Sequence, residues 1–259
     1  MEKEKATLVL INPVGNDADC WQFLGPIGGS PFLYPGHGGR KRLPGWTHQQ
    51  IADEVVAKFD GPLDLVGMSV GGLIVSHILT RHAGRVRSAL IACCFLARGA
   101  RDPGAREQYR RTQTERGELA LRGGMAAAVE ATLPRWFTPL AIRTEAPGVA
   151  YARRTLLAMD PQAWNDIWLA GANSEAVTLD ALSAVRQPVT LLAGTHDAAA
   201  GLGLAQAHEF IPHSRLEIVA GPHMLHLEEP LGMLSALERH FAWVPIGNRV
   251  EQPLGTLVA

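Results

Sequence analysis

The sequence predicts an α/β fold, in which a mostly parallel sheet carries helices on both faces and a helical cap is inserted between two of its strands. Strand-like and helix-like segments alternate near both ends of the chain, as in successive β-α-β units. The intervening stretch has a helical pattern far longer than an ordinary crossover connection. We therefore expect a core of residues 1–94 and 179–259, with a tail at 243–259, and a cap at 95–178.

The expected strands are short runs of aliphatic and β-branched residues that end in polar or glycine-containing loops. They cover residues 6–11, 63–66, 90–96, 188–193 and 215–219. Residues 47–59 are expected to form a helix with Thr47 as its N-cap, because a threonine side chain can accept a hydrogen bond from a free N–H group of the first turn.

One serine lies between a strand-like run and a helix-like run. The segment Gly67-Met68-Ser69-Val70-Gly71-Gly72 follows the strand at 63–66 and precedes an apolar helical run at 73–79. This order is typical of a nucleophile elbow, in which a strained turn exposes the serine hydroxyl at the end of a sheet and glycines permit close packing. The sequence therefore predicts that Ser69 is a nucleophile.

A serine hydroxyl needs a base to remove its proton and an acid to orient that base. Asp197 follows the strand at 188–193, and His223 follows the strand at 215–219. In this type of site the order along the chain is serine, acid, histidine, each placed after a strand. We predict a triad of Ser69, Asp197 and His223.

Two backbone N–H groups are expected to hold the oxyanion that forms during attack on a carbonyl group. Val70, directly after the serine, supplies one. Val14, in the loop after the first strand, supplies the other, because Pro13 has no N–H. His226 lies three residues beyond His223, and we expect it to contact the substrate or to pack beside the pocket.

Several segments together resemble one family of enzymes. The chain is similar to the α/β-hydrolases, and among them to the 3-oxoadipate enol-lactonases, from residue 6 to about residue 242. The cap segments are the most specific to the lactonases. The matching segments are Asn12-Pro13-Val14-Gly15-Asn16 with Trp21, Gly67-Met68-Ser69-Val70-Gly71-Gly72, Gly124-Met125-Ala126-Ala127, Arg135-Trp136-Phe137-Thr138-Pro139, Leu157-Ala158-Met159-Asp160-Pro161, Ala193-Gly194-Thr195-His196-Asp197 and His226-Leu227-Glu228-Glu229-Pro230.

The resemblance implies a serine hydrolase that opens a small anionic lactone or ester in aromatic catabolism, through an acyl-enzyme and without cofactor or metal. Residues 98–154 contain eleven arginines and six acidic residues, a net charge of +5 (11 − 6). Arg135 and Trp136 are the expected substrate contacts, because a guanidinium beside an aromatic wall can bind a substrate carboxylate bidentately.

The sequence departs from the lactonases in three places. Only five residues precede the first expected strand, so we expect no equivalent of the leading hairpin of the usual fold. The loop at 34–39 is more similar to that of acyl-carrier and menaquinone-pathway hydrolases. The tail at 243–259 extends beyond the usual last helix. A carboxylesterase, a carbon–carbon bond hydrolase, a perhydrolase or a slow-turnover binding or signalling protein on the same scaffold remain alternatives.

Composition limits the setting and the partners. The chain has 24 basic and 25 acidic residues and 47% hydrophobic residues, so we expect no bulk attraction to nucleic acid or membrane. The chain has three cysteines, two of them the pair Cys93-Cys94 on an expected strand, and this predicts a reducing compartment. The apolar stretch at the N-terminus is short for a signal peptide, so we expect a cytoplasmic location. The expected partner is a small-molecule substrate, and a homo-oligomer is possible.

Overall fold

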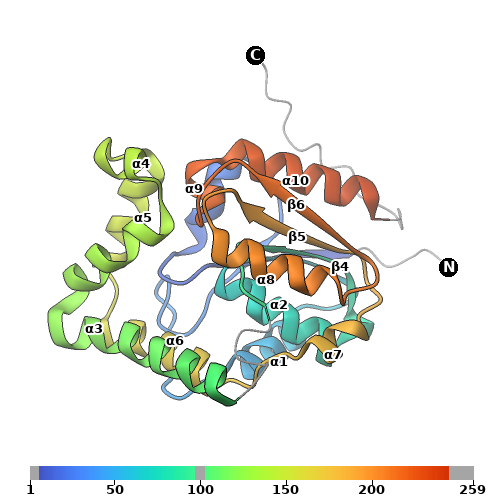
Figure 1. The fold of residues 1–259 in the computed structure, drawn as a ribbon, viewed down its shortest axis with the longest axis horizontal. Coiled ribbons are helices and arrows are strands. Elements are labelled where there is room, and N and C mark those ends of the chain that lie inside the picture. Colours follow the sequence, from blue (N-terminus) through green and yellow to red (C-terminus); the bar gives the residue numbers. More distant parts are fainter. Residues whose placement is uncertain (1–5, 97–102, 245–259) are drawn as a thin grey trace.

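A single sheet with six parallel strands forms the centre of the molecule (Figure 1). The computed structural model describes residues 6–96 and 103–244. The spatial order of the strands is β2-β1-β3-β4-β5-β6, and every neighbouring pair is parallel. The strands are β1 (Thr7–Ile11), β2 (Ser30–Phe32), β3 (Leu63–Met68), β4 (Val86–Ala92), β5 (Val189–Gly194) and β6 (Ser214–Val219).

Helices lie on both faces of this sheet. The 3₁₀-helix η1 and α10 lie on one face, and α1, α2 and α8 lie on the other (Figure 1). Strand β3 is buried along its whole length, as expected for a central strand covered on both sides. The core elements outside the sheet are η1 (Ala18–Leu24), α1 (His48–Lys58), α2 (Val70–Arg81), η2 (Ala83–Arg85), α7 (Leu179–Ser183), α8 (Ala198–His208), α9 (Leu225–Glu228) and α10 (Pro230–Trp243).

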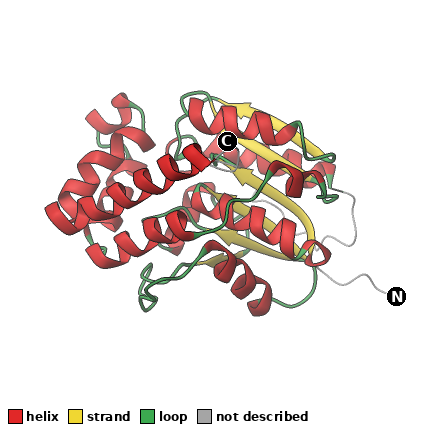
Figure 2. Cartoon of the chain, turned by 60° about the horizontal axis from the view of Figure 1, so that its bottom comes forward, coloured by secondary structure: helices red, strands yellow, loops and turns green. Residues whose placement is uncertain are grey.

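In the described part of the insertion between β4 and β5, helices α3 to α6 form the cap, a separate layer beside the sheet (Figure 2). Helix α3 is long and bends at Gly124, whose φ of 71° interrupts the helix. The cap helices are α3 (Pro103–Trp136), α4 (Pro139–Arg143), α5 (Pro147–Leu157) and α6 (Pro161–Asn173). The predicted α/β fold with a helical insertion is confirmed, whereas the exact domain boundaries stay predictions.

Two hydrogen-bonded contacts attach the cap to the core beside the site. The Glu228 carboxylate accepts hydrogen bonds from the Thr138 N–H, at 3.0 Å, and from the Thr138 hydroxyl. The backbone N–H of Met224 donates to the Trp136 carbonyl at 3.0 Å. The end of α3 is therefore held against the segment that follows β6.

Features that depend on residues close together in the sequence agree with the structure. Thr47 caps α1 as expected, and its side chain and that of Gln50 form a reciprocal capping box. Strand β2 is not among the runs that the residue pattern predicts, because it is three residues long and contains Pro31, which is unfavourable inside a strand.

The prediction that the cysteine pair lies on a strand was wrong. Strand β4 ends at Ala92, and Cys93, with a φ of 47°, turns the chain out of the sheet. Most of the predicted tail, residues 245–259, lies outside the described residues.

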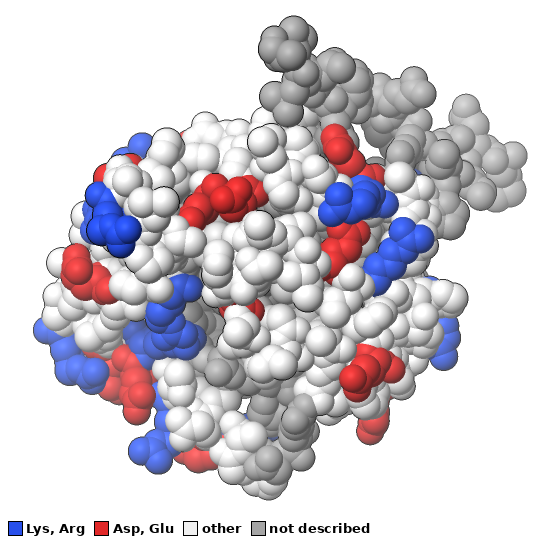
Figure 3. Space-filling view, turned by 45° about the horizontal axis from the view of Figure 1, so that its top comes forward, with Lys and Arg blue, Asp and Glu red and all other residues white. Residues whose placement is uncertain are grey.

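Charged side chains of both signs are mixed on the face shown in Figure 3, in keeping with a net charge of −1. Among the described residues, none of the helices combines the length and the apolar character required to span a membrane.

Five histidines are buried in the described structure, and the pKa of four of them is lowered. Burial lowers the pKa of His37 and of His77 to about 4, and that of His48 and of His226 to about 3, from an ordinary value of 6.5. Desolvation is the main cause for all four, because a charged imidazolium loses its hydration in the interior. Each ring is therefore neutral in the folded protein at pH 7.

These neutral histidines predict a loss of stability in mild acid. Between about pH 6.5 and pH 4 the unfolded chain binds protons that the folded chain excludes, so the free energy of unfolding falls as the pH falls. Each histidine contributes up to about 1.4 kcal/mol per pH unit in this window. Urea denaturation at pH 7, 6 and 5 measures the slope. The variant His48→Leu should make the slope shallower, and an unchanged slope in that variant would contradict the assignment.

Candidate active site

The turn between β3 and α2 places Ser69 at the carboxyl end of the sheet. Ser69 has φ 55° and ψ −115°, a strained conformation for a residue with a side chain. Its N–H donates to the Ala92 carbonyl at 2.9 Å, which anchors the turn to the neighbouring strand. A Cβ atom on Gly71 would overlap the carbonyl oxygen of Ile11, so glycine is required where α2 approaches β1.

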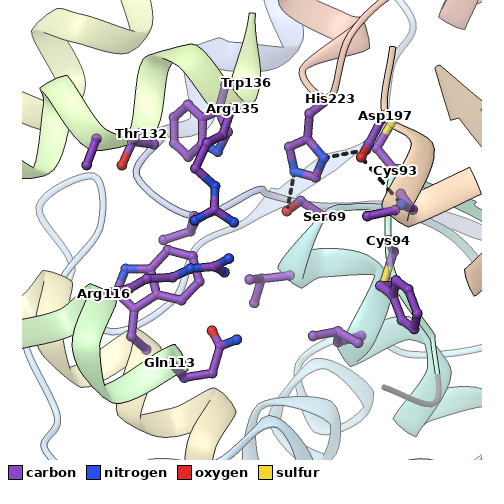
Figure 4. A pocket seen from close by; sticks show the side chains of 18 of the residues that line it. Ser69, Cys93, Cys94, Gln113, Arg116, Thr132, Arg135, Trp136, Asp197 and His223 are labelled. Carbon is purple, nitrogen blue, oxygen red and sulfur yellow. Dashed lines mark hydrogen bonds and ion pairs between the residues drawn. The ribbon is translucent and has the colours of Figure 1, made fainter. Parts of the chain in front are cut away.

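His223 joins Ser69 to Asp197 through two hydrogen bonds (Figure 4). The distance from His223 Nε2 to Ser69 Oγ is 2.9 Å, and that from His223 Nδ1 to Asp197 Oδ2 is 2.6 Å. Because an ionised carboxylate only accepts hydrogen bonds, the proton belongs on Nδ1, and Nε2 is left to accept from the serine hydroxyl. The three residues predicted from the sequence therefore meet in hydrogen-bonding geometry.

Asp197 is fixed by its position at the start of a helix. Strand β5 ends at Gly194, and Asp197 is the N-cap of α8, where its Oδ1 accepts from the Ala200 N–H at 3.4 Å. The other carboxylate oxygen is thereby directed to the imidazole. One oxygen stabilises the helix and the other orients the histidine.

A cavity of about 190 Å³ lies over these residues, between the sheet and the cap. Ser69, His223 and Asp197 line it, together with both residues expected to hold an oxyanion, Val14 and Val70. The cavity therefore gives a carbonyl group access to the serine hydroxyl and to both valines.

The cap contributes an electropositive wall to this cavity. Arg135 and Trp136, predicted as substrate contacts, both line it; Trp136 is buried, whereas Arg135 is exposed. Arg116 also lines the cavity, and Figure 4 shows the Arg116 and Arg135 side chains both reaching toward the space in front of Ser69. Among the described lining residues, Asp197 is the single carboxylate, and it is engaged with His223.

The sequence alone does not single out Arg116. Its guanidinium stacks on Trp168, with Cζ 5.1 Å from the ring centroid, and its Nε has no hydrogen-bond partner in the described structure. Gln113, one helical turn earlier, also lines the cavity and is buried. The sequence shows that Gln113 and Arg116 are three residues apart and so lie on the same face of a helix. It does not show that this face covers the cavity.

His226 does not have the predicted contact with substrate. It is completely buried, it is not among the residues that line the cavity, and its ring packs on Trp21 with centroids 5.4 Å apart. Burial, with a smaller contribution from the neighbouring His223, lowers the pKa of this ring and keeps it neutral. Of the two roles expected for His226, contact with substrate disagrees with the structure, whereas packing agrees with it, because the residue lies in the core beneath the site.

Cys93 and Cys94 line the same cavity, beside Asp197 (Figure 4). Burial raises the pKa of both thiols, and the Asp197 carboxylate raises them further. A thiolate is the reactive form of cysteine, so these side chains are poor nucleophiles. Within residues 6–96 and 103–244, no group of three or more His, Cys, Asp or Glu side chains is arranged to hold a metal ion.

Comparison with known proteins identifies the family. The model of the alpha/beta hydrolase family matches residues 8–236, so the chain belongs to that family. A pimeloyl-[acyl-carrier protein] methyl ester esterase of Chromobacterium violaceum is 28% identical over 215 residues, which cover 80% of each chain.

Solved structures agree on the fold. A thermophilic esterase from Thermogutta terrifontis is similar with a TM-score of 0.79 and 21% identity, covering 92% of this chain and 90% of that one. The enol-lactonase from Burkholderia xenovorans LB400 has a TM-score of 0.78 and 21% identity, covering 92% of both chains. The predicted superfamily and the prediction of a hydrolase are confirmed, while the finer similarity to lactonases stays a prediction.

The close approach at Gly71 predicts a position-specific effect of a single methyl group. Gly71→Ala should displace the first turn of α2 from β1 and destabilise the fold by about 1–3 kcal/mol, as overpacking does in other cores, with loss of esterase activity. Gly84→Ala is the matched control, because no atom lies within 4 Å of its added Cβ. Thermal unfolding and p-nitrophenyl acetate hydrolysis measure both effects, and equal behaviour of the two variants would refute this account.

Proposed function

We propose that this chain is a serine-dependent carboxylic ester hydrolase that acts on a small anionic lactone or ester. The observation that carries the proposal is the hydrogen-bonded series Ser69–His223–Asp197 at the floor of the cavity. Membership in the alpha/beta hydrolase family supports it.

The reaction begins with attack of Ser69 Oγ on the substrate carbonyl carbon. His223 Nε2 takes the hydroxyl proton, and Asp197 stabilises the resulting imidazolium. The negative charge that forms on the carbonyl oxygen is held by the N–H groups of Val14 and Val70. At the start of α2 the helix dipole adds to this stabilisation.

Collapse of this intermediate breaks the bond to the leaving oxygen. His223 returns its proton to that oxygen, and the acyl group remains on Ser69. If the oxygen departs as an enolate, the imidazolium gives its proton to the enolate or to solvent, so that His223 is neutral again before water attacks. In a lactone the leaving oxygen stays attached to the acyl chain, so the ring opens. Water then attacks the acyl-enzyme with His223 as the base, which releases the acid and restores Ser69.

The charges of the cavity wall favour an anionic substrate. Arg116 and Arg135 face a cavity whose one carboxylate in the described structure already interacts with His223. Partial removal from water strengthens a guanidinium–carboxylate pair relative to one at the surface. Of the two, Arg116 is half-buried and Arg135 is exposed, so Arg116 should contribute more to binding.

A second candidate is the hydrolysis of a methyl ester on a carrier-linked acyl chain. The observation that favours it is the match over 80% of the chain to a protein named pimeloyl-[acyl-carrier protein] methyl ester esterase. Both candidates use the same attack on a carbonyl group, and they differ in the alcohol that leaves. Turnover of an acidic lactone against the methyl ester of a dicarboxylic acid distinguishes them.

Replacement of the nucleophile tests the mechanism. Ser69→Ala should lower kcat by at least about a thousandfold and abolish covalent labelling by a fluorophosphonate, with thermal unfolding unchanged. Mass spectrometry of the labelled wild-type protein should locate the adduct on the peptide that contains Ser69. Substantial turnover by the folded Ser69→Ala variant would eliminate the serine mechanism.

Replacement of the cap arginines tests the substrate class. Arg116→Ala should weaken binding of an acidic lactone or ester by about 2 kcal/mol, seen as a higher KM, and Arg135→Ala by less. Hydrolysis of p-nitrophenyl acetate, which is neutral, should change little in either variant. Arg122→Ala is the control, since Arg122 is exposed on α3 and pairs with Glu118. If charged and neutral substrates were affected equally, the arginines would be structural.

A further inference from the structure

We infer that His37 is a positioning residue: its imidazole holds the loop at residues 12–16 in the one conformation that leaves the Val14 N–H available to the oxyanion. This inference rests on the proposed ester hydrolysis. His37 lies in the loop that follows β2, 22 residues away from the backbone group that it contacts. It does not line the cavity above Ser69, so it acts through the loop and not on the substrate.

The contact itself is a hydrogen bond from backbone to imidazole. The Gly15 N–H donates to His37 Nε2 at 3.0 Å, and His37 Nδ1 lies 3.3 Å from the Pro35 carbonyl oxygen. A carbonyl oxygen can only accept, so Nδ1 carries the ring proton and Nε2 presents its lone pair to Gly15. The two contacts select the same tautomer and require a neutral ring.

The protein keeps that ring neutral and immobile. His37 is 2% exposed, and its ring packs edge-on against Tyr34, with centroids 5.4 Å apart. The Tyr34 hydroxyl in turn donates to the Asn12 carbonyl at the start of the same loop. The loop after β2 therefore contacts the loop after β1 at two points, Asn12 and Gly15.

The peptide that joins Val14 to Gly15 is held at both of its polar groups. While its N–H donates to His37, its carbonyl oxygen accepts from Asn16 Nδ2 at 3.0 Å. Rotation of this peptide would break both hydrogen bonds in a buried environment, where unpaired polar groups are costly. The pair of contacts thereby restrains ψ of Val14 and φ of Gly15.

Such a restraint is needed because residue 15 is glycine. Gly15 has a φ of 77°, and a Cβ there would overlap Leu156 of the cap, so a larger residue does not fit. Glycine supplies this conformation but also leaves it easily, because it has few steric barriers. The imidazole of His37 offsets that freedom without placing a side chain in the crowded space.

The same hydrogen bond determines which N–H serves the site. Because the Gly15 N–H is engaged with His37, it is not available to a substrate oxygen, and Pro13 has no N–H. Val14 is then the loop residue that lines the cavity beside Ser69 and Val70. Preorganised donors are effective because they do not reorganise during the reaction, so a loosened loop should slow turnover more than it weakens substrate binding.

The test compares two substitutions at position 37. His37→Leu removes the acceptor and should lower kcat for p-nitrophenyl acetate about ten- to a hundredfold, with KM within about twofold. Affinity for a trifluoromethyl ketone, which forms a tetrahedral oxyanion on Ser69, should fall in parallel with kcat/KM. His37→Gln, whose Oε1 can accept from the Gly15 N–H, should recover part of the loss in kcat and part of the loss in ketone affinity. The matched control is His48→Leu, because His48 is another buried neutral histidine. This variant should leave kcat and ketone affinity unchanged.

A substitution at Asn16 tests the other hydrogen bond that holds the peptide between Val14 and Gly15. Asn16→Ala removes the donor to the Val14 carbonyl and should reproduce the fall in kcat and in ketone affinity, which keeps the inference testable if His37→Leu does not fold. The inference about His37 would be overturned if a folded His37→Leu protein kept the wild-type kcat and ketone affinity. It would also be overturned if His37→Leu and His48→Leu lost equal amounts of both. In either case Ser69-dependent turnover of the wild type would still stand, so this failure is distinguishable from failure of the proposed function.

Discussion

The parallel direction of the strands is the constraint on which the site depends. Because β1, β3, β5 and β6 run in the same direction, their carboxyl ends meet at one edge of the sheet. The loop at residues 12–16, the turn at Ser69, Asp197 and His223 each follow one of these strands. Strand pairing thus brings groups separated by up to 154 residues to the same edge, where they meet within hydrogen-bonding distance. The cap then closes the space above that edge.

Two kinds of support hold the site at this edge. Backbone contacts place the turn at Ser69, because only glycine at position 71 allows α2 to approach β1. Buried side chains hold the neighbouring loop, because His37, Asn16 and Tyr34 bind its polar backbone groups. A strained turn and a glycine-containing loop would both relax without these contacts. The core therefore supplies rigidity, whereas the cap contributes two arginines, Arg116 and Arg135, to the wall of the cavity.

Much of the fold and of the site could be predicted from the sequence, where each signal is local. The strands that precede Ser69, Asp197 and His223 are runs of apolar residues, and a polar or glycine-containing turn after a buried strand is recognisable in one dimension. The capping of α1 by Thr47 depends on residues three positions apart. The short β2 gave no such signal, because its pairing with β1 and not its composition makes it a strand.

The sequence by itself determined the class of chemistry: which serine, which carboxylate and which histidine meet, and on what kind of sheet. Tertiary structure decided what surrounds them. Arg116 lines the cavity with its guanidinium stacked on Trp168 of α6, and His226 is buried against Trp21. His37 reaches Gly15 across two loops. These contacts join residues far apart in the chain, and packing in three dimensions, which no local pattern encodes, selects them.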